Sequence, residues 1–405
     1  MTEENMSKLE ELIEQYCPDG VEYYKIKDVY KRIKGTPITA GKMKEIATPD
    51  GSVRIFAGGK TVIDANEKDI PNANITRVPA VLIQSRGVID AVYYDKPFTF
   101  KNEMWAYTTF NQKSVKYLYY ILKSNIQTFR DAASGMGALP QISLGVTEEF
   151  EIPVPPLPVQ EEIVRILDAF TELQAELQAE LQKRKQQYNY YRDNLLTNFT
   201  QEQAPKEYTL GEVTVDIYSG ATPSKEKREY WVNGTIPWMS SGEVNLGQVY
   251  EVEGRITQLG YDKCSTKMVP EGSVVIALAG QGKTRGTVAI LRTSVCTNQS
   301  LAALVPQKEI VSGEYLYYYL KTQYAKLREV SAGDGTRGGL NLKMLRAYKV
   351  VIPSHKAQDQ IVSILDRFDS LTNDLTSGLP AEIEKRRQQY EYYRDKLLTF
   401  KRKGA

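Results

Sequence analysis

The residues best suited to chemistry lie in VVIALAGQGKTRGT, residues 274–287. A hydrophobic run followed by GQGKT is similar to a phosphate-binding loop, in which glycine amides and a lysine hold the phosphates of a nucleotide. That pattern requires glycine where this chain has Ala277, and the following RGTVAIL predicts a second strand instead of a helix facing the phosphate. We therefore predict a hairpin loop that presents Lys283, Thr284 and Arg285.

Few other residues suit catalysis. The single histidine, His355, leaves little room for a histidine-based zinc site or a Ser-His-Asp triad. Cys17, Cys264 and Cys296 lack metal-ligand spacing and are expected to be reduced thiols of a cytoplasmic protein. We find no Asn-Pro-Pro-aromatic word, no glycine-rich turn for a methyl donor and no acidic-plus-lysine nuclease cluster. The sequence therefore predicts a chain that is not an enzyme and carries no metal or cofactor.

The loops instead combine residues that can recognise DNA bases. Arg and Lys bind guanine, Asn and Gln bind adenine, and Ser or Thr can bind either. The candidate contacts in the first half are Thr36, Lys60, Thr61, Ser85, Arg86 and Asn102. Those in the second half are Ser219, Thr222, Lys225, Ser240, Ser241, Lys283, Arg285 and Arg337. An ordinary surface loop is the simpler interpretation of any one of them, so the hypothesis concerns the whole set.

The sequence segments expected to position these loops occur twice, as an internal repeat. QEEIVRILDAF at residues 160–170 matches QDQIVSILDRF at 358–368, an offset of 198 as from Ile163 to Ile361. RKQQYNYYRDNLLT at 184–197 matches RRQQYEYYRDKLLT at 386–399, an offset of 202 as from Tyr188 to Tyr390. Weaker matches precede them, such as YLYYILK and YLYYYLK. An internal repeat of about 200 residues indicates two copies of one unit, each a variable domain followed by a helix.

Each repeated segment is expected to be helical. Residues 159–199 carry apolar positions at spacings of three, four and seven, and IPVPPLP before them gives a clean start. The second copy, residues 357–400, is predicted to break at SGLPAE, where Gly378 closes one helix and Pro380 opens the next. The apolar face of such a long helix must pack against another element to be stable. A pseudo-two-fold repeat favours packing of the two copies as long antiparallel helices. The alternative is that each helix packs only against its own domain.

The variable domains are expected to be mixed and mainly β. PAVLIQS, AVYY, GSVVIALAG and GTVAILR are short β-branched runs, and residues 115–130 and 313–330 predict helices. Net charge is only +2, so a role in nucleic-acid binding requires locally concentrated basic residues. There is no run of 18 apolar residues, and the polar N-terminus is unlike a secretory signal. The composition therefore predicts a cytoplasmic protein with no membrane partner.

Taken together, these words make the chain similar to the specificity subunits of Type I restriction-modification systems. The similarity covers nearly all of the chain and rests on the duplicated IV-ILD-F and QQY-YYRD-LL helices, the IP-P-Q lead-ins, and the GTP and GATP openings. It implies an α+β protein of two mixed, mainly β target-recognition domains joined by two long antiparallel helices. Its domains would be residues 1–155, a spacer helix at 156–200, residues 201–353 and a second spacer helix at 354–405.

The resemblance also implies partners. Each target-recognition domain would read one half of a split double-stranded DNA site, and the helices would dock two methyltransferase subunits. Restriction subunits, which are translocases and nucleases, would add to that core. S-adenosylmethionine and the catalytic residues would belong to the methyltransferase partners, with no cofactor in this subunit. The break near Gly378 departs from a symmetric pair of helices.

The word TELQAELQAELQ at residues 171–182 repeats one tetrad three times. One tetrad adds about 6 Å and about 40° to a helix, whereas one DNA base pair adds about 3.4 Å and about 35°. A recognition domain that faces the wrong groove is worse placed than one displaced by about 3 Å. The rotation should therefore set the spacer length, and each tetrad would add about one base pair. A four-residue insertion also nearly preserves the apolar stripe through Leu173, Leu177 and Leu181. The simpler interpretation, that AELQ is merely a strong helix former, would explain why the segment is helical but not why the tetrad is repeated exactly.

Three hypotheses follow. The chain is a non-catalytic subunit that recognises a bipartite DNA site, with the helices as a ruler. Alternatively, it is a scaffold whose two domains bind proteins on a coiled-coil spacer and read no DNA. A third hypothesis, an enzyme that uses the GQGKT loop, requires nucleotide binding that Lys283→Ala abolishes. The basic words LQKRKQQY and IEKRRQQY suit DNA phosphates or an ordinary solvated helix face equally well.

Overall fold

The computed structural model describes residues 3–59, 61–134, 139–280, 284–332, 339–373 and 377–404. The chain divides into two compact units. Unit 1 comprises residues 1–178 and 382–405, and unit 2 comprises residues 179–381. Below, head 1 denotes residues 1–155 and head 2 denotes residues 201–353. Each unit therefore holds one head together with part of both helical segments.

Head 1 is built on an antiparallel sheet in the order β2-β8-β5-β6. Its strands are β2 (Lys31–Lys34), β8 (Trp105–Thr108), β5 (Ala80–Gln84) and β6 (Asp90–Tyr94). A smaller sheet, β4-β3-β7, consists of β3 (Val53–Phe56), β4 (Val62–Ala65) and β7 (Phe98–Phe100), with β3 and β7 parallel. The shorter elements are α1 (Glu3–Tyr16), α2 (Ile26–Val29), α3 (Ala40–Ile46), η1 (Glu67–Asp69), α5 (Ile126–Asp131) and α6 (Leu144–Glu148). The β-branched runs PAVLIQS and AVYY found in the sequence form β5 and β6, as predicted.

Head 2 repeats this plan with additions. Its main sheet has the order β11-β19-β16-β17-β13, and its smaller sheet the order β14-β12-β18-β15, in which β12 and β18 are parallel. The main-sheet strands are β11 (Thr214–Ser219), β19 (Leu301–Pro306), β16 (Val274–Ala277), β17 (Val288–Leu291) and β13 (Gln248–Val249). The others are β14 (Arg255–Ile256), β12 (Ile236–Met239), β18 (Val295–Thr297) and β15 (Met268–Val269). Short helices are η2 (Gln201–Gln203), η3 (Arg228–Tyr230), η4 (Ser241–Leu246), α8 (Gln258–Asp262), α10 (Tyr324–Ala332) and α11 (Leu342–Arg346).

A matching pair of elements connects each head to the helices. A two-stranded sheet lies beside the start of a long helix, formed by β1 (Tyr23–Lys25) with β9 (Glu151–Pro153) in head 1, and by β10 (Lys206–Thr209) with β20 (Lys349–Ile352) in head 2. A tyrosine-rich helix packs on each main sheet, α4 (Gln112–Ser124) in head 1 and α9 (Gly313–Thr322) in head 2. The predicted helical pieces at 115–130 and 313–330 are confirmed, each as two successive helices, α4 with α5 and α9 with α10.

The first repeated helix is continuous and the second is broken. Helix α7 runs from Leu157 to Thr197, while the second copy forms α12 (His355–Asn373) and α13 (Leu379–Leu398). Both copies begin in the same way, because a glutamine amide donates to the carbonyl of the proline five residues earlier. Gln160 Nε2 donates to the Pro155 oxygen at 2.7 Å, and Gln358 Nε2 to the Pro353 oxygen at 3.0 Å. The second copy is broken as predicted, and α13 begins at Leu379, next to Pro380, but α12 ends at Asn373 and not at Gly378.

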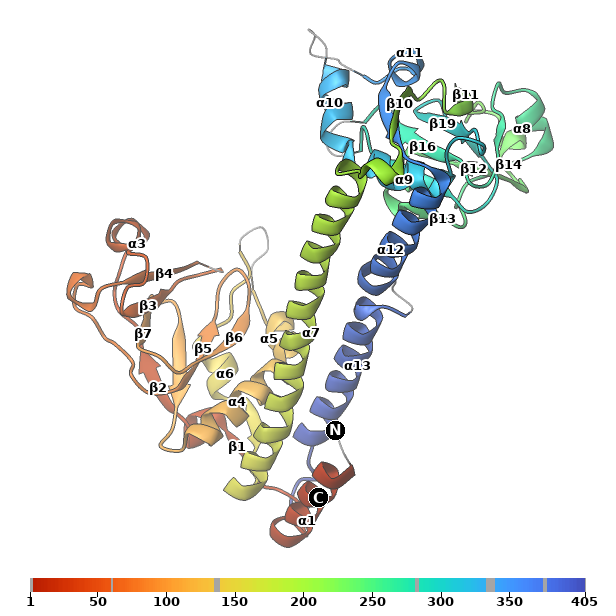
Figure 1. Ribbon diagram of the computed structural model, residues 1–405. Helices are drawn as coiled ribbons and strands as arrows, with labels where there is room; N and C mark the ends of the chain where they lie inside the picture. The colour runs from red at the N-terminus through yellow and green to blue at the C-terminus, as the bar shows by residue number, and fades with distance from the viewer. Residues whose placement is uncertain are drawn as a thin grey trace. The chain divides into compact units, whose positions relative to one another are not determined.

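In unit 1 the early part of α7 packs on head 1 and also beside α13 (Figure 1). Phe170 of α7 lies within 6.2 Å of the Tyr390 ring and stacks on Tyr393 at 5.7 Å between ring centroids. The start of α7 and the end of α13 come together near Glu151, which pairs with Arg402. The two helices of this unit are therefore antiparallel, as predicted.

Unit 2 contains the equivalent contacts. Phe368 of α12 lies 6.4 Å from the Tyr188 ring of α7 and stacks on Tyr191 at 5.6 Å. The same helices pack on α9 of head 2, with Ile361 and Leu365 in the shared core. Each unit thus combines helix–helix packing with packing on its own head, so the alternative in which each helix packs only against its own domain is wrong.

The tetrad segment of α7 belongs to neither core. Buried positions of α7 extend to Phe170 and resume at Tyr188, and none of residues 171–187 is buried. Leu173, Leu177 and Leu181 are half-buried. A change of length in this segment therefore removes no residue from either hydrophobic core.

Candidate nucleic-acid interface

Three loops of head 1 meet at one end of its sheets, and we call the described residues 57–59, 61, 84–88 and 101–104 reading edge 1. Hydrogen bonds join the three loops to one another and to β3. These are Gly59 N to Arg86 O at 3.1 Å, Ser85 Oγ to Glu103 O at 2.5 Å, and Lys101 N to Phe56 O at 3.0 Å. The structure therefore brings together segments of head 1 that the sequence proposed separately.

A cavity of about 650 Å³ lies beside reading edge 1. The lining combines the apolar side chains of Met43, Ile63, Val88 and Leu139 with Thr61, Arg86, Lys101 and Glu103. Thr61, Arg86 and Asn102 are exposed. Lys101 and Glu103, on either side of Asn102, form an ion pair at 3.0 Å. This combination of an apolar surface and few charged groups suits the edges of bases better than a row of phosphates.

Two candidate residues of head 1 are corrected by their burial. Thr36 is fully buried, and its hydroxyl lies 2.7 Å from that of Thr99 and accepts from the Asn74 amide at 2.9 Å. Ser85 is also fully buried and donates to the Glu103 carbonyl. Neither side chain offers a surface to a base. Thr36 instead links β7 to Asn74, and Ser85 links two loops of reading edge 1.

Head 2 has an equivalent edge, and we call the described residues 219–225, 239–243, 278–280, 284–286 and 298–301 reading edge 2. Its segments are joined in the same manner. The joining hydrogen bonds are Asn298 N to Met239 O at 3.1 Å, Leu278 N to Ser300 O at 2.8 Å, and Thr222 Oγ1 to Gln299 Oε1 at 2.5 Å. Ser219, Thr222, Ser240 and Ser241 are half-exposed at this edge, and Lys225 is exposed.

Several of these side chains have internal roles. The Ser240 hydroxyl lies in a capping box with Glu243 at the start of η4, and the Thr222 hydroxyl is bonded to Gln299. Arg285 is half-buried, and its carbonyl accepts a hydrogen bond from Arg328 at 3.3 Å. Lys60, Lys283 and Arg337 were also predicted as contacts and lie outside the described residues.

The sequence analysis missed Gln299, an exposed side chain at the tip of the turn between β18 and β19. Asn102 occupies the equivalent turn between β7 and β8 in head 1. The surrounding words KNEMW and NQSLA share too few letters to reveal this correspondence. Only the pairing of the strands aligns the two positions.

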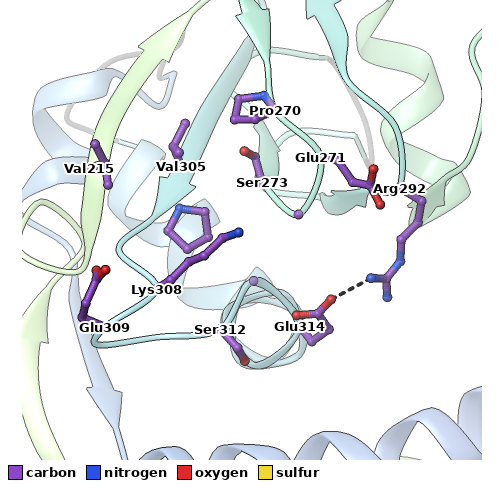
Figure 2. A pocket seen from close by; sticks show the side chains of 13 residues that line it. Val215, Pro270, Glu271, Ser273, Arg292, Val305, Lys308, Glu309, Ser312 and Glu314 are labelled. Atoms are coloured by element: carbon purple, nitrogen blue, oxygen red, sulfur yellow. Dashed lines mark hydrogen bonds and ion pairs between the residues drawn. The ribbon is translucent and has the colours of Figure 1, made fainter.

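A second cavity, of about 820 Å³, lies at the other end of the main sheet of head 2, where β16 begins and β19 ends (Figure 2). Lys308 extends toward its middle, and Arg292 forms an ion pair with Glu314 at 2.7 Å. Glu271 and Glu309 also line it, so carboxylates outnumber cations. This charge and its distance along β16 from the hairpin loop separate the cavity from reading edge 2, and it does not suit a phosphate backbone.

The sequence analysis left one catalytic alternative, a phosphate-binding loop at GQGKT. Strands β16 and β17 form an antiparallel hairpin, which confirms the hairpin prediction for GQGKT against a strand-to-helix phosphate loop. No group of three His, Cys, Asp or Glu residues that could hold a metal occurs among the described residues. Burial raises the pKa of the Cys296 thiol to about 11, which disfavours the reactive thiolate form.

The basic words on the helices are partly neutralised within their own helices. Arg184 pairs with Glu180 at 2.6 Å, and its counterpart Arg386 pairs with Glu382 at 2.7 Å. Arg387 also contacts Glu384 at 2.7 Å. These pairs favour a solvated helix face over a DNA-phosphate surface, because each arginine already has an acidic partner.

Two heads with equivalent polar edges, held on antiparallel helices, define a two-site recognition protein. A family model described as the Type I restriction modification DNA specificity domain matches residues 18–184 and 204–385. The chain therefore belongs to the Type I restriction-modification DNA specificity family. It is a non-catalytic DNA-recognition subunit, and family membership does not favour the protein-scaffold alternative.

Individual relatives agree with this assignment. The chain is 39% identical over 297 residues to the Type I restriction enzyme EcoR124I/EcoR124II specificity subunit of Escherichia coli, covering 72% of each chain. It is 27% identical over 382 residues to a putative type I specificity subunit of Mycoplasma pneumoniae, covering 93% of this chain and 97% of that one. The crystal structure of a Type I restriction-modification S subunit from M. genitalium matches with a TM-score of 0.58 at 19% identity, covering 93% and 95% of the two chains, and supports the fold. In the described residues no helix is long and apolar enough to cross a membrane.

Proposed function

We propose that each head reads one half of a bipartite double-stranded DNA site and that the chain directs methyltransferase subunits to it. The observation that carries the proposal is the duplication of the whole reading apparatus. Reading edges 1 and 2 are assembled by equivalent backbone hydrogen bonds, Lys101 N to Phe56 O and Asn298 N to Met239 O. Their side chains nevertheless differ, so the two heads would read two different base sequences.

The helices support two docking sites for one kind of partner. Tyr190 of α7 is 66% exposed and Tyr392 of α13 is 64% exposed. Each packs edge-on against the next tyrosine, Tyr191 or Tyr393, with the same interplanar angle of 74°. Exposed tyrosines with an apolar body and a polar tip are typical anchors of protein interfaces. Two equivalent anchors in one chain suit two copies of a methyltransferase subunit.

The remaining components belong to the assembled complex. S-adenosylmethionine and the methyl-transfer residues would be supplied by the methyltransferase partners, and restriction subunits would join that core. The complex would act in the cytoplasm, where its DNA substrate lies. This chain contributes the recognition surfaces and the helices that connect them.

The tetrads would set the number of unread base pairs between the half-sites. Residues 171–187 contribute to neither hydrophobic core, so their number can change without altering the packing of either head. Half-buried Leu173, Leu177 and Leu181 keep one face of the helix apolar. A whole tetrad preserves that face, because four residues complete slightly more than one helical turn.

Methylome sequencing tests both parts of the proposal. Cells that carry this chain with its methyltransferase partners should show methylated adenines in one bipartite motif. Deletion of residues 175–178 should keep both half-sites and shorten the unread spacer by about one base pair, because rotation outweighs translation. Sequencing of modified bases measures the half-sites and the spacer in one experiment.

The control for this deletion is Ala175→Ser, which changes composition without changing length. A deletion variant that still purifies with its partners but methylates the original spacer would disprove the ruler. A wild-type complex that produces no bipartite motif would contradict DNA reading by the two heads.

A further inference from the structure

The two heads present a side-chain amide at the same structural position. In head 1, Asn102 is the tip of the turn that joins β7 to β8, and in head 2, Gln299 is the tip of the turn that joins β18 to β19. Both residues are exposed. In each case the preceding strand lies parallel to the neighbouring strand of the smaller sheet, β3 in head 1 and β12 in head 2. The correspondence is therefore one of topology and not only of residue type.

Matched hydrogen bonds hold the two turns in the same way. Each turn closes by a bond from the fourth residue to the first, Met104 N to Lys101 O at 3.0 Å and Leu301 N to Asn298 O at 3.3 Å. In each turn the carbonyl after the amide residue accepts a bond from the end of the adjacent β-strand. In head 1, Ser85 Oγ donates to Glu103 O, and in head 2, Leu278 N donates to Ser300 O. Both tips are thus fixed to their sheets on two sides.

A tightly packed glycine lies beside each turn. A Cβ atom on Gly35 would lie 2.1 Å from the Phe100 carbonyl oxygen, and one on Gly220 would lie 1.8 Å from that of Thr297. Only glycine permits this approach, so the segment that contains each glycine is held against the strand that leads to the tip. A side chain at the tip therefore projects from a well-fixed backbone.

The turn itself does not require Gln299. Asparagine often occurs in turns because its side chain bonds to the backbone two residues on, but in head 2 that bond is made by Asn298, whose Oδ1 accepts from Ser300 N at 3.0 Å. Gln299 instead accepts a hydrogen bond from the Thr222 hydroxyl at Oε1. Since a carbonyl oxygen has two lone pairs, Oε1 retains one acceptor site, and the Nε2 amide keeps its donors. One acceptor and one donor on an amide are the groups that recognise adenine N6 and N7.

We infer that Asn102 and Gln299 are specificity-determining residues, each reading one adenine from the major groove at corresponding positions of the two half-sites. Thr222 is a positioning residue that orients the Gln299 amide. The inference rests on the proposed function, because it requires each head to read DNA. It adds which side chains read, which base each prefers, and the expectation that the two half-sites share this adenine.

The test is methylome sequencing of cells that carry this chain with its methyltransferase partners and no restriction subunit. Gln299→Ala should make one base pair of one half-site degenerate, with a loss of discrimination of about ten- to a hundredfold. Asn102→Ala should do the same in the other half-site only. Gln299→Arg should change the preference at that base pair from adenine to guanine, because arginine bonds to guanine O6 and N7.

Exposed glutamines elsewhere on the same heads provide matched controls. Gln112→Ala in head 1 and Gln258→Ala in head 2 should leave the motif unchanged. Thr222→Val keeps the Gln299 amide and removes only the hydroxyl that orients it, and it should weaken discrimination at the same base pair by a few-fold. If Gln299→Ala does not assemble with the partners, Thr222→Val still tests the inference.

An unchanged motif in Gln299→Ala and Gln299→Arg would overturn the inference. So would degeneracy spread over the whole half-site, or a wild-type motif without adenine at the affected position. These outcomes are distinct from failure of the proposed function, in which the wild-type complex would show no bipartite motif.

Discussion

The two copies of the repeated helix agree where they touch a head and differ in between. In unit 1 the Phe170 ring stacks on Tyr393 at 5.7 Å and 26°, and in unit 2 the Phe368 ring stacks on Tyr191 at 5.6 Å and 27°. A tyrosine of each head also donates to the aspartate two residues before the phenylalanine. Tyr120 Oη lies 2.5 Å from Asp168, and Tyr318 Oη lies 2.6 Å from Asp366. The repeated words ILD-F and QQY-YYRD are therefore the residues that build one contact set twice.

Between these contacts with the heads, the two helix copies differ. Helix α7 is continuous through three tetrads, whereas the second copy ends at Asn373 and begins again at Leu379. No residue from 171 to 187 is buried, so packing places little constraint on this segment. The difference teaches that the junction of helix and head is fixed by contacts, while the length between junctions is free to vary. A ruler requires this division, because its ends must be rigid and its length adjustable.

Removal of the aromatic junctions should give the largest effect on stability. Phe170 is 4% exposed, so Phe170→Ala should cost about 3–5 kcal/mol of unfolding free energy. Phe368 is half-buried, and Phe368→Ala should cost less, about 2 kcal/mol. Hydrogen exchange of the amides in each unit should show the loss in unit 1 for the first variant and in unit 2 for the second.

Phe170→Leu is the matched control, because it keeps most of the apolar volume and should lose less than half as much protection. Equal losses in both units from either single variant would contradict the separation into two independently packed junctions.

Much of this arrangement could be predicted from the sequence because it depends on local pattern. The long helix and its break followed from apolar spacing, the proline-rich lead-in and Gly378 with Pro380. The GQGKT hairpin followed from the strand-like RGTVAIL after the lysine. The duplication could be seen because the helices repeat many letters. In each case the physical cause acts over a few residues, or the same letters recur about 200 residues later.

The reading edges could be predicted only in part, since they depend on contacts between distant segments. Thr36 was chosen for its residue type, yet it is fully buried and hydrogen-bonded to Thr99, which lies far along the chain. Gln299 was missed because its equivalence with Asn102 arises from strand pairing and not from shared letters. A loop residue's exposure depends on which strands the fold places beside it, and one sequence does not specify that.

The exposed tyrosines provide a second test of the equivalence between the copies, with a smaller effect. Tyr190→Ala and Tyr392→Ala should each weaken docking of one methyltransferase copy by about 2 kcal/mol, or roughly thirtyfold, as for an interface anchor. Because both side chains are solvent-exposed, the stability of the free chain should change by less than about 0.5 kcal/mol. Analytical ultracentrifugation at limiting partner concentration would detect complexes that lack one copy.

Tyr250→Ala, at a residue of head 2 that is 69% exposed, should leave both copies bound. If either helix variant released both partner copies together, the two docking sites would not be independent, and the proposed equivalence would be wrong.

The smallest expected effect comes from a buried carboxylate at the start of the first helix copy, which the second copy lacks. Glu162 of α7 has a side chain only 5% exposed, and it pairs with Arg165 at 2.6 Å and with Lys8 of α1 at 3.0 Å. The hydrogen bonds from Arg165 and then Lys8 hold the pKa of Glu162 below its ordinary value, although burial acts to raise it. At the matching positions of the second copy the chain has the uncharged residues Gln360 and Ser363. Only unit 1 should therefore carry this pH dependence.

Since the folded-state pKa of Glu162 is lowered, its contribution to stability is present above the ordinary carboxyl pKa and is lost as pH falls through the lowered value. Glu162→Gln should thus destabilise unit 1 by about 1 kcal/mol at pH 7, because both cationic partners are partly exposed and screened. At a pH below both pKa values the variant and the parent should be equally stable. Hydrogen exchange of unit 1 at several pH values measures this difference, with the exposed neighbour Glu161→Gln as control. A difference that persisted undiminished in acid would assign the effect to side-chain shape, and the contrast between a charged and a neutral helix start would then be mistaken.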